Sequence, residues 1–338
     1  MRKEKRSQGT STISTFAGPE PLDAHKFLPR EFLPFLERCP SLAVIGGTPL
    51  VRLVCMEKPG VEVYAKVEYF NPGGSIKDRP VLWMLLSAIL DGSLTKERTV
   101  IDSSSGNAGI AYAMIGAALG YKVKLVVPGN ASQERKKRIV AHGAELHLTD
   151  PVEGYDEALR TVHRLAKAEP ERYFFCDQYA NRNNWRAHFN MTAPEILEQT
   201  SRRVTHFVGG VGTGGTITGV GRRLKEELGQ KVQIVCIQPD AFPGIEGLKP
   251  LDDPGDIVPE IFDASVVDRK ISVSIDHAYA LCQKLARNGL FVGQSSGAYL
   301  RGVEEVVCSL DRGVVVTILN DFGERYFSTR LWDDLGKP

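Results

Sequence analysis

The segment GGVGTGGTITG, which runs from Gly209 to Gly219, follows the β-branched run Thr205–Val208 and leads into the helical pattern Ile217–Glu227. A glycine-rich turn between a strand and a helix leaves backbone N–H groups free at the start of the helix, where they bind anions. The hydroxyl groups of Thr213 and Thr216 can add two further donors. The segment therefore predicts an α/β unit with a site for one phosphate group.

The same segment has the GxGxxG spacing of dinucleotide-binding loops, at Gly210, Gly212 and Gly215. A dinucleotide site also needs an acidic residue at the tip of the next strand, to hold the ribose. The next predicted strand, Gln233–Gln238, ends in glutamine instead. A Walker loop is excluded because no GK[ST] sequence follows. A nicotinamide oxidoreductase is therefore only a weak alternative.

Three further turns lie between a strand-like run and a helical pattern: NPGGSIKDR at Asn71–Arg79, DSSSGNAG at Asp102–Gly109 and GQSSGA at Gly293–Ala298. The first places Lys77 where burial and the helix dipole lower the pKa of its amine, which favours Schiff-base chemistry. Each turn alone is also explained by a solvated lysine or a capped helix. Together they supply the parts of a pyridoxal phosphate site, and we expect them to cluster at the carboxyl edge of a sheet.

Short β-branched runs alternate with helical patterns over most of the chain, which predicts an α/β fold with a parallel sheet. The predicted strands are Val61–Val67, Thr99–Asp102, Lys122–Val127, Glu145–Leu148, Thr205–Val208, Gln233–Gln238, Ser265–Val273 and Val314–Leu319. The predicted helices are Asp78–Leu90, Ala108–Leu119, Gln133–His142, Tyr155–Glu169, Ile217–Glu227, Ile275–Arg287 and Gly297–Leu310.

Two stretches depart from this alternation. Residues 1–40 are polar at first and then carry a Phe/Leu-rich piece, Phe27–Leu36. We expect them to form an arm laid on another surface, such as that of a partner subunit. The segment Ala241–Ile261 is rich in proline and glycine and predicts a long irregular loop, a kind of loop that is often functional.

The composition excludes several classes of protein. The 338 residues include 42 Lys+Arg and 41 Asp+Glu, so no one-signed basic surface for nucleic acid is expected. The apolar run Val81–Leu90 is about half as long as a membrane span, and the basic N-terminus lacks the apolar region of a secretory signal. The six cysteines show no CxxC spacing, which argues against a metal site. We expect a cytoplasmic protein.

The four turns, in this order and spacing, resemble the fold-type II pyridoxal-phosphate enzymes, most closely the cysteine synthase and cystathionine β-synthase group. The resemblance extends from IGGTPL at Ile45–Leu50 to GERYFST at Gly323–Thr329. It implies a fold like that of the tryptophan synthase β subunit, with two three-layer αβα domains and the active site between them. Residues 41–70 and 190–332 would form the large cofactor-binding domain, residues 71–189 a small, mobile substrate-binding domain, and residues 1–40 an N-terminal extension.

The resemblance also implies roles for the motif residues. Lys77 would hold pyridoxal phosphate as an internal aldimine and later act as acid and base at the substrate Cα. Asn107 would donate a hydrogen bond to the 3′-oxygen of the cofactor, and Ser295 would face its pyridine nitrogen. The residues that would hold the 5′-phosphate are Gly212, Thr213, Gly214, Gly215 and Thr216. The residues that would hold the substrate α-carboxylate are Ser104, Ser105, Gly106, Asn107 and Gln178.

The implied reaction is β-replacement on an O-activated L-serine, either O-acetylserine or O-phosphoserine, through an aminoacrylate intermediate. Sulfide or a sulfur carrier would then add to give L-cysteine. The serine at position 295 agrees with this reaction, because a hydroxyl group cannot hold the pyridine nitrogen protonated as a carboxylate would. The cofactor is then a weaker electron sink, which favours elimination over racemisation or transamination. The resemblance further implies a homodimer.

Three segments resemble the B-type cysteine synthases: FPGIEGLK at 242–249, VPEIFD at 258–263 and NDFGER at 320–325. Some relatives of that branch use O-phosphoserine, and Lys249 is the predicted contact to its phosphate. The nucleophile stays open, since homocysteine would give cystathionine and an amino acid would give a diaminopropionate derivative. A non-catalytic regulatory member of the fold is a further alternative.

Overall fold

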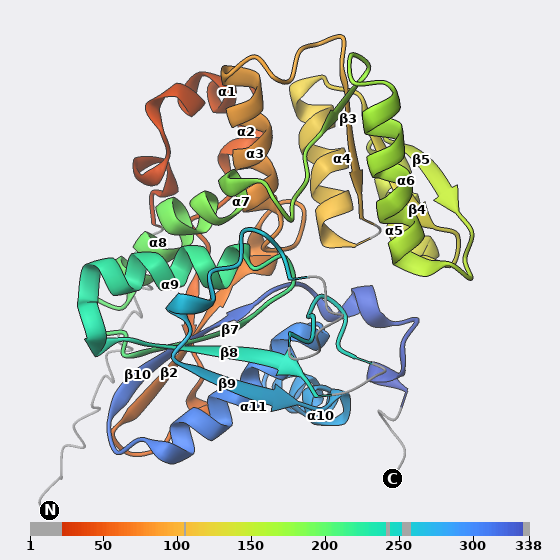
Figure 1. The fold of residues 1–338 in the computed structure, drawn as a ribbon. Coiled ribbons are helices and arrows are strands. Elements are labelled where there is room, and N and C mark those ends of the chain that lie inside the picture. Colours follow the sequence, from red (N-terminus) through yellow and green to blue (C-terminus); the bar gives the residue numbers. More distant parts are fainter. Residues whose placement is uncertain (1–21, 105, 241–243, 252–257, 334–338) are drawn as a thin grey trace, which may run out of the picture.

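Two β-sheets organise the chain in the computed structural model, which describes residues 22–104, 106–240, 244–251 and 258–333 (Figure 1). In order of pairing, the larger sheet consists of β1 (Leu50–Arg52), β2 (Val61–Val67), β10 (Gly313–Leu319), β7 (His206–Gly210), β8 (Gln233–Pro239) and β9 (Arg269–Val273). The smaller sheet consists of β5 (Glu145–Thr149), β4 (Val123–Pro128), β3 (Thr99–Ser103) and β6 (Tyr173–Phe175). All neighbours are parallel except β1 and β2, so the predicted α/β fold with parallel sheets is confirmed.

The two sheets are interleaved along the chain. The larger sheet begins with β1 and β2, and its order then places the late strand β10 between β2 and β7. The whole smaller sheet lies between β2 and β7 in the sequence. Segments far apart in the chain therefore meet wherever the larger sheet is built.

Helices cover both sheets (Figure 1). In chain order they are α1 (Leu33–Arg38), α2 (Pro40–Ala43), α3 (Asp78–Leu90), α4 (Asn107–Leu119), α5 (Gln133–Ala141), α6 (Gly154–Ala168), α7 (Arg182–Ala187), α8 (Ala193–Gln199), α9 (Gly215–Leu228), α10 (Ile275–Ala286) and α11 (Gln294–Ser309). Helix α9 lies on one face of the larger sheet, and α11, with α10 beside it, lies on the other. Within the described ranges, none of the helices is long and apolar enough to cross a membrane.

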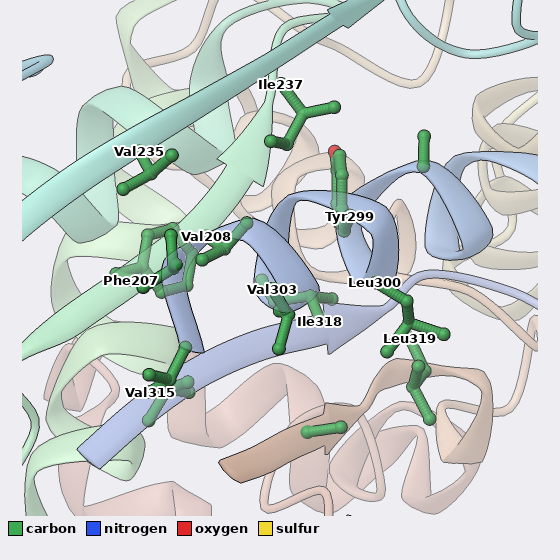
Figure 2. Close-up of a cluster of buried hydrophobic side chains, with 14 of the residues drawn as sticks. Phe207, Val208, Val235, Ile237, Tyr299, Leu300, Val303, Val315, Ile318 and Leu319 are labelled. Carbon is green, nitrogen blue, oxygen red and sulfur yellow. The ribbon is translucent and has the colours of Figure 1, made fainter. Parts of the chain in front are cut away.

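The main hydrophobic core fills the larger sheet and its helices. Leu300 and Val303 of α11 lie against Ile318 and Leu319 of β10, and all four side chains are fully buried (Figure 2). Each such side chain contributes about 1.5–3 kcal/mol by leaving water. This packing fixes the strand ends and the start of α11, where the turn at Gly293–Ala298 lies.

The predicted elements are present, with a few differences. Strands β1 and β6 have three residues each and were too short for the pattern to indicate. The predicted strand Ser265–Val273 begins only at Arg269, because residues 264–266 form a 3-10 turn in which Asp263 caps Ser265. Helices α7 and α8 were not predicted, and a π-helix, His188–Thr192, joins them just before Pro194 of α8, which has no N–H to donate.

The N-terminal expectations need one correction. Leu28, Phe32 and Leu36 are buried in a cluster with α3 of the same chain, and the Phe32 ring meets Trp83 edge-on with 5.1 Å between ring centroids. The apolar face of Phe27–Leu36 therefore covers this chain itself, and the expected contact with a partner subunit is wrong for these side chains. Residues 1–21 of the arm lie outside the described ranges.

The loop predicted at Ala241–Ile261 is only partly described. Residues 244–251 and 258–261 contain no helix or strand, as expected, and residues 241–243 and 252–257 lie outside the described ranges.

Candidate active site

A cavity with an empty volume of about 580 Å³ lies where elements of the two sheets meet. Asn107 at the start of α4 and Arg135 on α5 line it from the side of the smaller sheet. Gly210 at the end of β7 and Ser295 on α11 line it from the larger sheet, and Lys77 lies between them. All four turns singled out in the sequence contribute residues to its wall. The fourth turn, however, follows only an isolated bridge of Val292 with Phe322 instead of a strand.

Lys77 occupies the residue before the first turn of α3. Its backbone N–H donates to Ser75 Oγ at 3.2 Å, which holds the turn that delivers the lysine to the cavity. Loss of hydration lowers the pKa of the Lys77 amine to about 8, against the opposing charge of Asp321. A substantial share of the amine is therefore neutral, and nucleophilic, slightly above neutral pH.

The glycine-rich segment forms an open cradle between β7 and α9. Gly214 has a φ of +83°, and a Cβ at this position would lie 2.7 Å from the Cβ of Phe262. A Cβ at Gly212 would lie 2.5 Å from the backbone oxygen of Gly247. Gly212, Gly214, Thr213 and Thr216 line the cavity, and Gly215 is the first residue of α9. The N-terminal N–H groups of this 14-residue helix thus face the cavity and suit a phosphate.

His188 supports this cradle from behind. Its Nε2 lies 3.3 Å from Thr216 Oγ1, and its Nδ1 lies 3.0 Å from Thr192 Oγ1. Burial, aided by the charge of Arg79, lowers the pKa of His188 well below its usual value, so the ring is neutral. Sequence reasoning missed this residue, because nothing local to position 188 indicates that the π-helix brings it to residue 216.

Asn107 takes part in a network of polar side chains from distant parts of the chain. Its Nδ2 donates to Asp321 Oδ2 at 2.7 Å, and its Oδ1 accepts from Arg325. The Tyr326 hydroxyl donates to the same Asp321 oxygen at 2.7 Å. Burial raises the pKa of Asp321 against the pull of Arg325. Asp321 lies in the NDFGER segment that resembles the B-type cysteine synthases, but the sequence did not predict a role for its carboxylate.

Ser295 has a neutral surrounding. Its Oγ accepts from Asn320 Nδ2 at 3.0 Å, and the backbone N–H of Asn320 donates to Ser296 Oγ at 2.9 Å. Ser295 therefore presents an uncharged hydroxyl to the cavity, as the sequence analysis assumed for a contact to a pyridine nitrogen.

Of the described residues predicted to hold a substrate carboxylate, Asn107 lines the cavity, whereas Ser104, Gly106 and Gln178 are not among its lining. Ser104 Oγ accepts from the N–H groups of Gly106 and Gly109, at 3.3 and 3.1 Å, and so caps the start of α4. Gln178 is buried, and its backbone oxygen accepts from Asn184, which also donates to Thr213. Ser105 lies outside the described ranges.

The cavity is also lined by two charged residues, Arg135 and Glu246, for which no role was predicted from the sequence. Arg135 is 8% exposed and forms an ion pair with Glu246, and its Nε is buried with no hydrogen-bond partner among the described residues. Lys249, the predicted phosphate contact, lies elsewhere: its Nζ is 4.6 Å from the centroid of the Tyr179 ring. Arg135 is therefore a cation in the cavity wall, and Lys249 is not among the described lining.

A cluster of buried charges anchors the start of α3. Arg79 contacts Glu68 at 2.7 Å and Glu195 at 2.6 Å, and Lys66 contacts Glu195 at 2.6 Å, with all four side chains fully buried. Burial opposes ionisation of Glu68 and Glu195, but the Arg79 charge prevails and holds the pKa of both carboxyls below their usual value. Because Arg79 follows Lys77 by two residues, the cluster fixes the backbone that carries the lysine.

These residues fit pyridoxal phosphate. The Lys77 amine suits an aldehyde, because its pKa of about 8 leaves it partly neutral. The turn at Gly212 and Gly214, where neighbouring atoms leave no room for a Cβ, lines the cavity with backbone and suits the phosphate. Asn107 and Ser295 supply uncharged polar groups for the rest of the ring.

Comparisons with known proteins agree with this fit. The family model described as pyridoxal-phosphate dependent enzyme matches residues 42–321. The chain is 49% identical over 304 residues to a cysteine synthase of Aquifex aeolicus, covering 87% of this chain and 92% of that protein. It is 41% identical over 299 residues to cysteine synthase B of Pseudomonas aeruginosa, covering 87% and 98%. A crystal structure of O-ureido-L-serine synthase superposes with a TM-score of 0.82 at 36% identity, covering 88% and 96%.

The match to the family model spans most of the chain, and the relatives are matched along nearly their whole length. The chain therefore belongs to the pyridoxal-phosphate-dependent enzymes and, within them, to the family of the cysteine synthases.

Proposed function

We infer that the protein forms L-cysteine by β-replacement, from an O-activated L-serine and sulfide or a sulfur carrier. The observation that carries this function is the meeting of Lys77, the glycine cradle, Asn107 and Ser295 in one cavity, in a chain related to cysteine synthases over 87% of its length. O-acetylserine and O-phosphoserine are the two candidate donors.

Bound pyridoxal phosphate supplies an electron sink that stabilises negative charge at the substrate Cα. Lys77 would hold the cofactor and would take the proton from the substrate Cα, for which its lowered pKa suits it. Asn107 would donate to the 3′-oxygen, and the Ser295 hydroxyl would donate to the uncharged pyridine nitrogen. The phosphate is held by Gly212, Thr213, Gly214, Gly215 and Thr216.

The substrate α-carboxylate is assigned to the loop Ser104–Asn107 and to Gln178. Since the Ser104 hydroxyl already accepts two helix N–H groups, it is oriented to donate its own hydrogen to a carboxylate. Ser104, Gly106 and Gln178 lie outside the cavity lining, so we propose that substrate binding draws the small domain, residues 71–189, toward the large domain of residues 41–70 and 190–332.

The leaving group of the donor is assigned to cations near the cavity. We propose Lys249 and Arg135 as contacts to the phosphate of O-phosphoserine. Among the described residues the Arg135 Nε–H has no acceptor, and Glu246 would have to yield part of the Arg135 guanidinium to an incoming anion.

A second candidate function keeps the donor half of the reaction and changes the nucleophile. It is favoured by the structural similarity to O-ureido-L-serine synthase. The name of that enzyme denotes a product that is a serine derivative with a ureido group, and not cysteine. Homocysteine or an amino acid are further nucleophiles of this kind. A regulatory member of the fold without turnover is opposed by the complete set of Lys77, Asn107, Thr213 and Ser295.

The oligomeric state and location are proposals by family analogy. We propose a homodimer in the cytoplasm, and light scattering of the purified protein would test the dimer.

The deciding experiment crosses two donors, O-acetylserine and O-phosphoserine, with three nucleophiles, sulfide, homocysteine and glutamate. We expect cysteine from sulfide and at least one donor, visible absorbance of the bound cofactor, and loss of both in Lys77→Ala. Absence of the cofactor band, or full activity of Lys77→Ala, would overturn the function. A faster reaction with homocysteine or glutamate would establish the second candidate instead.

A further inference from the structure

The side-chain amide of Asn107 is held at both of its polar atoms. Its Nδ2 donates to Asp321 Oδ2, and its Oδ1 accepts from Arg325. A flipped amide would place N–H groups against a guanidinium and an oxygen against a carboxylate. Only one of the two amide orientations therefore satisfies both partners, and it leaves one Nδ2–H without an acceptor among the described residues, on a side chain that lines the cavity.

Asp321 is itself fixed. It is fully buried directly after Asn320, and its backbone oxygen accepts from the Gly293 N–H at 3.2 Å. The Tyr326 hydroxyl donates to the same carboxylate oxygen as Asn107. A Cβ at Gly293 would overlap both Asp321 Oδ1 and the Tyr326 ring, so the carboxylate has no room to turn away from Asn107.

Arg325 is fixed by the lysine turn. Its Nη2 donates to the backbone oxygen of Gly73, and a Cβ at Gly74 would lie 2.7 Å from that nitrogen. The guanidinium thus connects two parts of the site, the turn that carries Lys77 and the amide of Asn107. Its two contacts leave it little freedom to swing away.

We propose that Asp321 and Arg325 are positioning residues that lock the amide of Asn107 so that it offers an N–H, and not its oxygen, to the 3′-oxygen of the cofactor. The proposal rests on the cofactor contact assigned to Asn107 under the proposed function. Neither residue is among the described lining of the cavity, so the pair acts through Asn107. A free amide would spend part of its time presenting its oxygen, which repels the 3′-oxygen.

A double-mutant cycle tests this, with the dissociation constant of pyridoxal phosphate measured by titrating the apoprotein and following visible absorbance. In the otherwise native chain, Asp321→Ala and Arg325→Gln each weaken cofactor binding roughly tenfold or more, the size expected for loss of a hydrogen bond to a charged group. In a chain that also carries Asn107→Ala, the same changes have less than about a twofold effect, because the amide on which they act is absent. The affinities are compared at a pH well above 8, where the Lys77 amine is neutral with or without the Asp321 charge.

Glu324→Gln is the matched control, since Glu324 is the exposed neighbour of Arg325 and its change should leave the dissociation constant unaltered. Asp321→Asn keeps the shape and an acceptor oxygen, so it should recover most of the affinity lost in Asp321→Ala, and it replaces that variant if the alanine form does not fold. Equal losses with and without Asn107 would overturn the proposal. An unchanged native chain that fails to bind the cofactor would overturn the proposed function instead.

Discussion

Arg79 Nη1 lies 2.6 Å from Glu195 Oε1, and neither side chain is exposed to solvent. Arg79 belongs to the first turn of α3 and Glu195 to α8, so this ion pair ties the backbone next to Lys77 to the helices beside the larger sheet. Arg79 also forms an ion pair with Glu68, and Glu195 forms one with Lys66. Lys77 is thus anchored by side chains that are not among the described lining of the cavity.

Breaking this anchor should destabilise the whole protein. Glu195→Gln leaves the buried charges of Arg79 and Lys66 short of one anion, and we expect a loss of about 3–5 kcal/mol in the free energy of unfolding. Urea denaturation measures it. Glu198→Gln is the control on the same helix, because its ion pair with Lys26 is exposed and should contribute less than about 1 kcal/mol. Similar losses in the two variants would contradict the anchoring role.

The capture of cofactor by apoprotein should depend on pH through Lys77. Below its pKa of about 8 the amine is protonated and unreactive, so the capture rate should rise as pH increases through about 8 and then level off. Asp321→Asn removes the carboxylate that raises this pKa, so the midpoint should move to lower pH. Stopped-flow absorbance at a series of pH values measures both, and an unmoved midpoint in Asp321→Asn would show that the two groups do not interact.

The cradle should tolerate no side chain at Gly214. Gly214→Ala meets both a φ of +83° and the close approach of Phe262, and we expect weaker cofactor binding as well as lower stability. Gly289→Ala is matched to it, with a φ of +88° and open space around the added Cβ. That control should lose about 1–2 kcal/mol of stability from backbone strain and keep its cofactor affinity. Unaltered cofactor affinity in Gly214→Ala would argue against phosphate binding at this turn.

The two cations near the cavity should be sensitive to the donor. If they contact the phosphate of O-phosphoserine, Lys249→Ala and Arg135→Gln should each lower kcat/KM for that donor by roughly 10- to 150-fold, as for a lost charge-assisted contact. Their effect on O-acetylserine should be far smaller, and Glu324→Gln should affect neither donor. A variant that loses the same factor on both donors does not contact the phosphate.

Sequence alone indicated the parts of the site whose chemistry is local. Lys77 and Gly209–Gly219 could be predicted because each lies in a glycine-containing turn between a strand and a helix. The structure brings both turns to one cavity. The α3 helix begins and ends where its apolar pattern does, at Asp78 and Leu90. Such features follow from neighbouring residues and need no knowledge of the fold.

What sequence did not indicate depends on tertiary contacts. Asp321 and Arg325 reach Asn107 across more than two hundred residues, and Arg135 meets Glu246 only when α5 packs beside the loop after β8. The buried face of Phe27–Leu36 was misassigned because its apolar pattern shows that it is covered but not by which surface. The spacing of residues along the chain does not predict these tertiary contacts.

The position of the last strand, β10, between β2 and β7 determines the order in which the two sheets can fold during synthesis. During synthesis the earlier segments leave the ribosome first, so the smaller sheet, confined to residues 99–175, can assemble while the rest is still being translated. The parallel pairing of β2 with β10 cannot form until later, since β10 spans Gly313–Leu319. Asn320 and Asp321 follow at once. Newly made chains are therefore expected to take up cofactor only after residue 321 has emerged, and prematurely terminated products should remain colourless.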